Sequence, residues 1–198
     1  MKRVLLLVAV MLMTVSITIA QDKAKKPSPV AKKTPQAATE SDEVNWLTMD
    51  DLQVKMKEKP KKVYIDFYTS WCGWCKKMDA TTMKNPELIK YMNEHFYAVR
   101  FDAERKDTVW FMRKPYYYEP KYKANTFAVE YLRGQMSYPT LVIMEEFYQN
   151  AQPVPGYHPV GEMEQILRFF GDDVYKKESW ADYQKSFKGT WDGSQQIS

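Results

Sequence analysis

The chain contains two cysteines, Cys72 and Cys75, which lie three positions apart in a sequence of 198 residues. A disulfide between them would close almost no loop, so it would constrain the unfolded chain little and stabilise the fold little. An exported protein that relies on disulfides for stability spreads its cysteines along the chain. The spacing therefore favours redox chemistry over a structural role for this pair.

The cysteine pair stands between a predicted strand and a predicted helix. Residues 63–68 are rich in aromatic and β-branched side chains, as in a buried central strand. The helix is predicted to begin at the cysteines and run toward Met83. A helix N-terminus offers unpaired N–H groups and the positive end of the helix dipole, which lower the pKa of a thiol below about 8.5. We therefore expect Cys72, at the exposed edge, to be the nucleophile and Cys75 to be the resolving thiol.

Residues 1–20 have the parts of a signal peptide. A short basic start precedes the apolar run of residues 4–15, and Thr18 and Ala20 are the small residues expected before a cut at Gln21. The apolar run is shorter than the roughly 20 residues of a transmembrane helix, which favours a cleaved leader over a membrane anchor. We expect a periplasmic protein without a transmembrane span in its mature chain, with secretion as the second choice.

A linker is predicted between the leader and the folded part. Residues 21–43 are rich in Lys, Pro, Ala, Ser and Thr and hold few large apolar residues, which predicts disorder. Loss of the two basic residues of the leader lowers the formal net charge from +4 to +2. So mild a charge gives no indication of a nucleic-acid partner.

Turn and capping signals divide the chain from residue 44 onward into helices and strands. The predicted helices cover residues 48–58, 72–83, 85–95, 125–133, 161–170 and 173–187, and the predicted strands cover residues 63–68, 96–102, 140–145 and 152–157. This order predicts a mixed α/β sandwich with a central sheet of four to five strands flanked by helices. The expected domain spans residues 44–188, with a helical extension at about 172–188, and a flexible tail follows at residues 189–198.

An aromatic insertion interrupts this order at residues 104–123. Residues 108–112 and 116–119 are predicted to form two strands of a protruding hairpin around residues 113–115. The hairpin would either pack one face on the domain or form a docking ridge beside the active site.

Two motifs resemble thioredoxins. Residues 64–78 (Tyr-Ile-Asp-Phe-Tyr-Thr-Ser-Trp-Cys-Gly-Trp-Cys-Lys-Lys-Met) are similar to the active-site strand and helix of that family, and residues 137–141 (Ser-Tyr-Pro-Thr-Leu) resemble its cis-proline loop. The motifs occur in the family's order, and the resemblance covers residues 44–171. It implies a thioredoxin-like three-layer sandwich. The Cys-Gly-Trp-Cys-Lys-Lys form resembles exported thioredoxin-like proteins of Bacteroidetes-type bacteria in particular.

The resemblance implies roles for residues around the cysteines. Pro139 would be cis and pack against the disulfide, and the backbone of Tyr138 would pair with the substrate chain. Trp71, Gly73 and Trp74 would also contact the substrate. From the residues alone, Pro139 would instead be a trans proline that opens a strand.

Asp66 matches the family's buried acid behind the resolving cysteine. A carboxylate within an apolar strand is costly unless it is paired or protonated. It could accept the proton of Cys75 through a water, or it could simply point to solvent. Thioredoxins carry a lysine near this acid, whereas Ala98 is expected at that register here, so Asp66 would have a less perturbed pKa or another partner. The Gly73-Trp74 dipeptide also departs from the family's Gly-Pro, which leaves the redox potential open.

These observations predict an exported thiol–disulfide oxidoreductase that acts as a reductant or isomerase on cysteine-containing exported proteins. The Cys72–Cys75 pair would be its redox group, without a metal or other cofactor, and a membrane thiol relay would supply electrons. The alternatives are an inert disulfide, a thioredoxin-like binding module without turnover, or a metal-delivery protein. The two histidines, His95 and His158, lie far apart in the sequence, which disfavours a zinc site.

Overall fold

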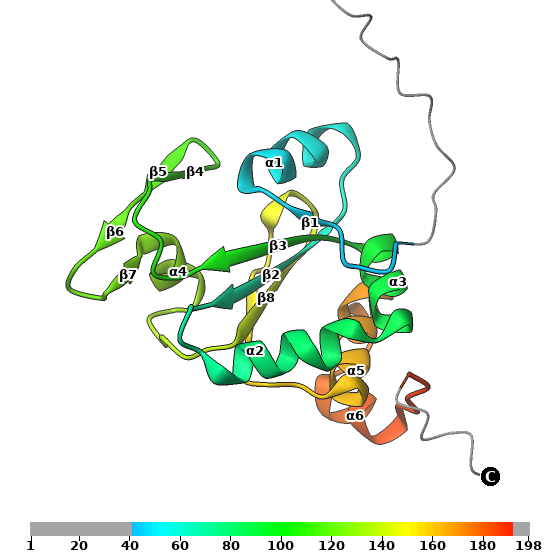
Figure 1. Cartoon of the computed structure of the whole chain (residues 1–198). Coiled ribbons are helices and arrows are strands. Elements are labelled where there is room, and N and C mark those ends of the chain that lie inside the picture. The colour runs from blue at the N-terminus through cyan, green and yellow to red at the C-terminus, as the bar shows by residue number, and fades with distance from the viewer. Residues whose placement is uncertain (1–40, 192–198) are drawn as a thin grey trace, which may run out of the picture. The chain divides into compact units, whose positions relative to one another are not determined.

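A central sheet of five strands, in the order β1-β3-β2-β8-β9, organises the domain. The computed structural model describes residues 41–191. The predicted leader, most of the predicted linker and residues 192–198 of the predicted tail lie outside the described residues. Helices cover both faces of the sheet (Figure 1), which confirms the predicted mixed α/β architecture.

The sheet combines parallel and antiparallel pairing. The central strand β2 (Lys62–Tyr68) runs parallel to β3 (Phe96–Asp102) and antiparallel to β8 (Thr140–Met144). The edge strands are β1 (Trp46–Leu47), beside β3, and β9 (Gln152–Pro155), beside β8. The sequence did not predict β1, because two residues are too few to show an alternating pattern.

Two helices begin where their capping residues predict. Thr48 accepts a hydrogen bond from the Asp51 N–H and starts α1 (Met49–Glu58). Asn85 caps α3 (Pro86–His95) in the same way. Side-chain caps satisfy N–H groups that the first turn of a helix leaves unpaired, which explains why these boundaries were predictable.

Other helices differ from the prediction in length. The remaining helical elements are α2 (Gly73–Ala80), η1 (Thr82–Lys84), α4 (Thr126–Tyr131), η2 (Glu146–Tyr148), α5 (Val160–Gly171), η3 (Val174–Lys176) and α6 (Trp180–Ser186). The predicted last helix is divided between η3 and α6, because Ser179 caps a new helix start. The backbone of Thr81 is non-helical and ends α2 before Met83.

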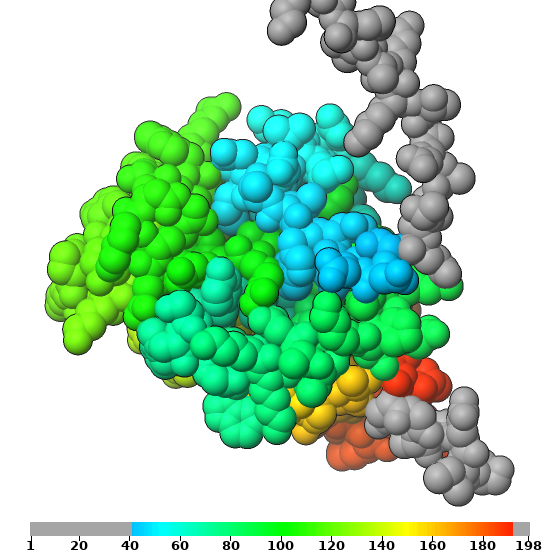
Figure 2. Space-filling model, in the orientation of Figure 1, coloured from blue at the N-terminus to red at the C-terminus, as the bar shows by residue number. Residues whose placement is uncertain are grey.

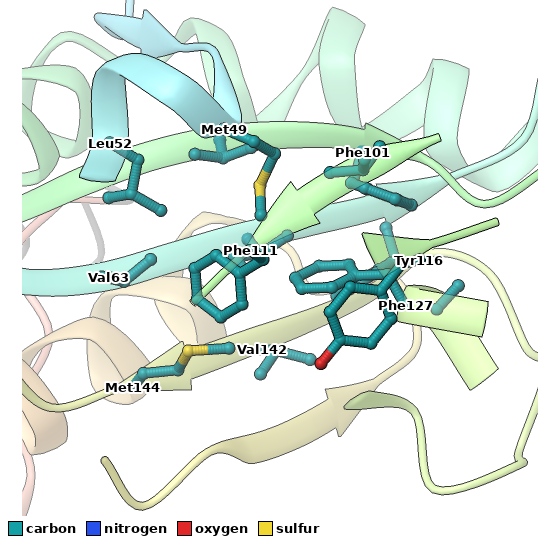
Figure 3. Close-up of a cluster of buried hydrophobic side chains, with 14 of the residues drawn as sticks. Met49, Leu52, Val63, Phe101, Phe111, Tyr116, Phe127, Val142 and Met144 are labelled. Carbon is teal, nitrogen blue, oxygen red and sulfur yellow. The ribbon is translucent and has the colours of Figure 1, made fainter. Parts of the chain in front are cut away.

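Each face of the sheet has its own apolar cluster. On one face, α1, α4 and the insertion pack around Phe127, which contacts Phe67, Phe101 and Phe111 (Figure 3). On the other face, α2, α3 and α5 pack around Tyr64. Burial of both sheet faces fixes the sheet between two helical layers.

The insertion forms two hairpins where one was predicted. These pair β4 (Val109–Phe111) with β5 (Lys114–Tyr116), and β6 (Tyr118–Glu119) with β7 (Ala124–Asn125). The first turn is at Met112 and Arg113, which both have positive φ angles. The predicted turn at residues 113–115 is therefore displaced toward Met112, and Pro115 belongs to β5.

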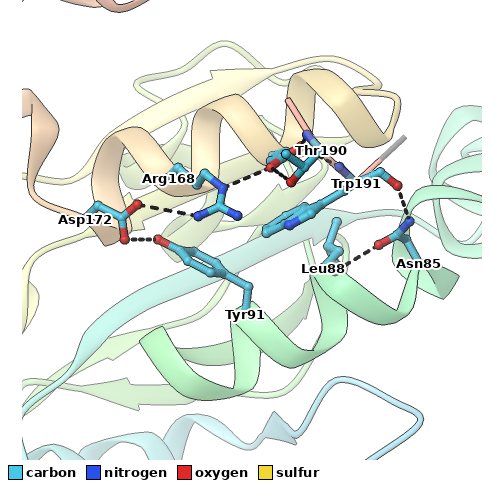
Figure 4. A network of polar contacts seen from close by, with 8 residues as sticks. Asn85, Leu88, Tyr91, Arg168, Asp172, Thr190 and Trp191 are labelled. Carbon is cyan, nitrogen blue, oxygen red and sulfur yellow. Dashed lines mark hydrogen bonds and ion pairs between the residues drawn. The ribbon is translucent and has the colours of Figure 1, made fainter. Parts of the chain in front are cut away.

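The prediction of a flexible tail is wrong for residues 189–191. The side chain of Trp191 is buried, and the backbone N–H groups of Thr190 and Trp191 donate to the carboxylate of Glu164 (Figure 4). Arg168 pairs with the same carboxylate, and the Asn85 amide donates to the Trp191 carbonyl. A buried acid on α5 thus holds residues 190 and 191 against the domain.

Candidate active site

The cysteines form a disulfide at the start of α2. Cys72 is the N-cap of this helix, and its Sγ accepts a hydrogen bond from the Cys75 N–H at 3.0 Å. The Thr69 carbonyl accepts the Cys72 N–H in the turn that follows β2. The local fold therefore places the sulfur of Cys72 at the positive end of the helix, where a thiolate is stabilised.

Both cysteines are buried in this disulfide state. Cys72 is 4% exposed and Cys75 is 2% exposed, so the expected exposure of Cys72 is wrong for this state. Its sulfur turns inward, because it is bonded to the sulfur of Cys75 and also caps the helix. In contrast, Trp71 and Trp74 are both more than half exposed. The two exposed indole rings therefore lie next to the buried disulfide in the chain.

Trp71 belongs to one aromatic wall of the site. Its ring meets the ring of Tyr138 edge to face at a centroid distance of 6.0 Å. Its indole Nε1–H donates to Glu104 at 3.0 Å. These two contacts fix the orientation of an exposed side chain and bring the predicted contact residues Trp71 and Tyr138 together.

Trp74 belongs to a second wall that the sequence did not predict. Its ring lies 5.4 Å from that of Tyr157, and the Lys77 ammonium lies within 5 Å of both ring centroids. The Tyr157 hydroxyl is 3.3 Å from that of Thr81. Tyr157 follows β9, 83 positions after Trp74 in the chain, and no local pattern links the two.

The loop before β8 lies at the same edge of the sheet. The Tyr138–Pro139 peptide bond is cis, Pro139 is buried, and its carbonyl accepts the Gly156 N–H at 2.8 Å. Thr140 then pairs with Phe67, near the end of β2. The pairing of β2 with β8 thus brings the proline loop close to the cysteine turn.

Asp66 is buried in the middle of the central strand. Its side chain is 1% exposed, and neither carboxylate oxygen accepts a hydrogen bond from the described part of the chain. Burial raises the pKa of Asp66 to about 6, the positive charge of Arg100 opposes this rise, and Asp79 adds to it. The alternative in which Asp66 points to solvent is therefore wrong.

Arg100, rather than Ala98, lies opposite Asp66. The parallel register pairs Asp66 with Arg100 and Tyr64 with Ala98, which corrects the predicted register. Arg100 Nε lies 3.3 Å from Asp66 Oδ2, a close charge contact without hydrogen-bond geometry, and its Nη2 donates to Asp79 at 2.8 Å. The sequence did offer a signal for this pair: Arg100 is the one basic residue of a buried strand, and such a charge needs a partner.

The face that carries Asp66 is the face covered by α2. Tyr64 and Asp66 alternate with Ile65 along β2, so they point to the same side. Tyr64 packs in one cluster with Met78, which lies one turn after the buried Cys75 on α2. Arg100 further connects Asp66 to Asp79 of α2. Asp66 thus lies on the face of the sheet that α2 covers.

The fold and site define a class of protein. A disulfide-bonded C-x-x-C pair begins a helix after the central strand of a mixed sheet, and the Pro139 loop lies at the same sheet edge. At the level of the family, this arrangement is that of a thiol–disulfide oxidoreductase. The chain belongs to the thioredoxin-like domain family, whose model matches residues 49–171.

Several solved structures share the fold. A candidate disulphide-isomerase from Bacteroides thetaiotaomicron is 19% identical, with 70% of this chain and 98% of that chain covered and a TM-score of 0.49. A thioredoxin-fold protein from Helicobacter pylori is 22% identical, with 63% and 78% covered and a TM-score of 0.46. A DsbH oxidoreductase is 18% identical, with 77% and 96% covered and a TM-score of 0.46. At these identities the likeness is one of fold alone. No curated protein matches the chain.

Two further findings concern residues 41–191. None of their helices is long and apolar enough to cross a membrane. No three of their His, Cys, Asp or Glu side chains gather as a metal-binding group. The ring of His95 stacks on Tyr91, whereas His158 lies 3.4 Å from Glu162.

Proposed function

We propose that this protein is an exported thiol–disulfide oxidoreductase that reduces or isomerises disulfides of cysteine-containing exported proteins. The observation that carries the proposal is the Cys72–Cys75 disulfide at the N-terminus of α2. The disulfide spans only three positions, so stabilisation of the fold does not account for it.

The reaction begins with the reduced protein. The thiolate of Cys72 attacks one sulfur of a client disulfide and expels the other client sulfur as a thiolate, which forms a mixed disulfide. The thiolate of Cys75 then attacks Cys72 Sγ. This forms the Cys72–Cys75 disulfide and releases the second client sulfur, which takes up a proton. Two electrons have then passed from the protein to the client.

Asp66 supports the second step in this proposal. Cys75 must lose its proton before it attacks, and a carboxylate behind α2 with a pKa of about 6 is mostly ionised at neutral pH. It accepts the proton through a bridging water. Arg100, in contact with Asp66, favours the ionised form of the acid.

Trp71, Gly73, Trp74, Tyr138 and Pro139 form the client-binding surface of the proposal. The exposed indoles offer rigid apolar area beside the disulfide, and the backbone before Pro139 pairs with an extended client segment. The redox group is the cysteine pair itself, and no other cofactor takes part.

Export and electron supply complete the proposal. The basic start, apolar run and small residues of residues 1–20 support a cleaved leader and a periplasmic location. A protein that reduces clients there must be reduced again, and we assign this role to a membrane thiol relay.

Trapping of mixed disulfides tests the proposal. Cys75→Ala removes the resolving thiol, so the mixed disulfide between Cys72 and a client protein should persist. A thiol reductant should release the trapped clients. Cys72→Ala is the matched control and should trap none. The protein is a binding module if Cys75→Ala traps no client in the compartment where the protein resides, while Cys72→Ala still binds the partners of the native protein without a disulfide.

The reduction potential tests the direction. A reductant or isomerase should have a potential at or below about −180 mV, in the range of thioredoxin and protein disulfide isomerase. A value near about −120 mV, as for a strong oxidant, would contradict the proposed direction and leave the thiol chemistry intact.

A further inference from the structure

The first hairpin of the insertion has one buried face and one exposed face. Val109 and Phe111 of β4 point into the core, whereas Trp110 between them is exposed. Trp110 pairs across the hairpin with Pro115, which is exposed as well. Met112, in the turn of this hairpin, and Tyr117, directly after β5, are exposed as well.

These four residues, Trp110, Met112, Pro115 and Tyr117, form what we call the outer strip. Trp110 and Met112 are each 57% exposed and Tyr117 is 54% exposed. The strip is held in place, because the side chain of Gln53 on α1 donates to the Trp110 carbonyl and accepts the Met112 N–H, both at 3.0 Å. Exposed apolar side chains of this size on a fixed backbone indicate a binding surface.

Basic residues surround the outer strip. Residues 104–123 contain six basic and three acidic residues. Within the described part of the chain, the basic residues of the insertion that have no carboxylate within 4.0 Å are Lys106, Arg113, Lys121 and Lys123. Arg113 adjoins Met112 at one end of the strip, and Lys121 and Lys123 belong to the turn that follows Tyr117 beyond β6. A partner of this surface should therefore be both apolar and anionic.

The insertion is at the same edge of the sheet as the disulfide. Cys72 follows β2, the insertion follows β3, and these two strands are parallel. Glu104, the first residue of the insertion, accepts the indole N–H of Trp71. The two hairpins form a lobe that projects from the domain (Figure 2).

We propose that the outer strip and its basic surroundings dock the domain on an anionic lipid surface. Trp and Tyr side chains are enriched at the boundary between lipid headgroups and acyl chains, and Lys and Arg near the surface are attracted to anionic headgroups. Docking in this way holds the disulfide edge of the sheet close to the membrane. A lipid surface suits the strip better than a protein, because four side chains fall short of the about 800 Å² per partner that a stable protein interface buries.

Co-sedimentation with vesicles tests this inference. The full chain is mixed with vesicles of equal parts phosphatidylglycerol and phosphatidylethanolamine, and separately with phosphatidylcholine vesicles. The double variant Trp110→Ser, Met112→Ser should bind the anionic vesicles at least about tenfold more weakly than the native chain, which corresponds to about 1.4 kcal/mol. Phe147→Ser is the control for loss of an exposed apolar side chain, because Phe147 is 55% exposed and belongs to η2, outside the insertion. It should bind as the native chain does.

The native chain, the double variant and the control variant share the same N-terminal residues. Any vesicle binding by those residues therefore does not affect the difference in binding between these proteins. Equal binding of the double variant and the native chain would overturn the inference. Equal binding of the native chain to both kinds of vesicle would also overturn it. A third contrary outcome is a native chain that binds no vesicles but captures a protein partner that the double variant fails to capture. Insulin reduction by the double variant in solution should be unchanged, so this outcome is distinguishable from failure of the proposed thiol chemistry.

Discussion

Replacement of Asp66 by asparagine removes the charge of a buried side chain and nearly preserves its size. Burial raises the pKa of this carboxyl from 3.8 to about 6 in the folded protein, although Arg100 opposes the rise. A difference of about two pKa units costs about 3 kcal/mol of folding free energy once the group is ionised. We therefore expect Asp66→Asn to be more stable than the native protein by up to about 3 kcal/mol at pH 8.

The gain in stability should depend on pH in one direction. Well below pH 3.8 the carboxyl is protonated in both the folded and the unfolded chain, so the substitution has little effect. As pH rises from there to about 6, the unfolded chain loses its proton first, and the native protein is progressively destabilised. Above about pH 6 the penalty is complete, so the advantage of the variant is small in acid and largest at neutral and alkaline pH.

Urea unfolding of the oxidised proteins at pH 4, 6 and 8 measures this difference. Asp79→Asn is the matched control, because it removes the other carboxylate that contacts Arg100 and leaves Asp66 free to titrate. The control should show a much smaller pH-dependent gain, because burial, the main cause of the raised pKa of Asp66, persists and only the contribution of Asp79 is lost. The same stability for Asp66→Asn and the native protein at pH 8, or a gain that is equal at pH 4 and pH 8, would refute the reasoning. The variant should also resolve mixed disulfides on the order of 10²-fold more slowly, as expected when a proton acceptor is lost.

Three further predictions concern other parts of the site and fold. Arg100→Gln should raise the pKa of Asp66 further, because Arg100 lowers it, so the pH profile of mixed-disulfide resolution should move to higher pH; an unmoved profile would contradict this. Trp74→Ala should change the free energy of unfolding by less than about 1 kcal/mol, because the ring is exposed. It should nonetheless raise KM for a protein disulfide and not for a small aromatic disulfide. Equal effects on both substrates would argue against a role of Trp74 in binding protein clients. Trp191→Ala should lower the free energy of unfolding by about 3 kcal/mol in urea titrations, because the side chain is buried. A loss below about 1 kcal/mol would show that Trp191 contributes little to the stability of the fold.

The sequence predicted elements that depend on local chemistry. The starts of α1 and α3 follow from Thr48 and Asn85, since each cap acts within one turn of its helix. The cysteine turn between β2 and α2 was likewise predicted from neighbouring residues. The predicted active-site residues belong to recognisable local motifs, and their catalytic and binding roles stay predictions.

Features that depend on long-range register were missed. Arg100 and Ala98 are both plausible neighbours of Asp66 when only the strands are known, because nothing local fixes the offset of two parallel strands. Tyr157 reaches Trp74 only through the path of β9. Trp191 is apolar within a polar tail, but its burial requires Glu164, whose position on α5 is not apparent from the tail itself.

The prolines of β9 have a consequence for how the protein behaves among other chains. β9 pairs with β8 through Leu141–Val154 and Ile143–Gln152, so Pro153 and Pro155 occupy the positions whose N–H groups would point away from the sheet. A foreign strand that approaches this edge finds those donors missing and cannot extend the sheet. In the proposed role, where the protein exchanges disulfides with incompletely folded chains, this edge of the sheet is protected from pairing with their strands.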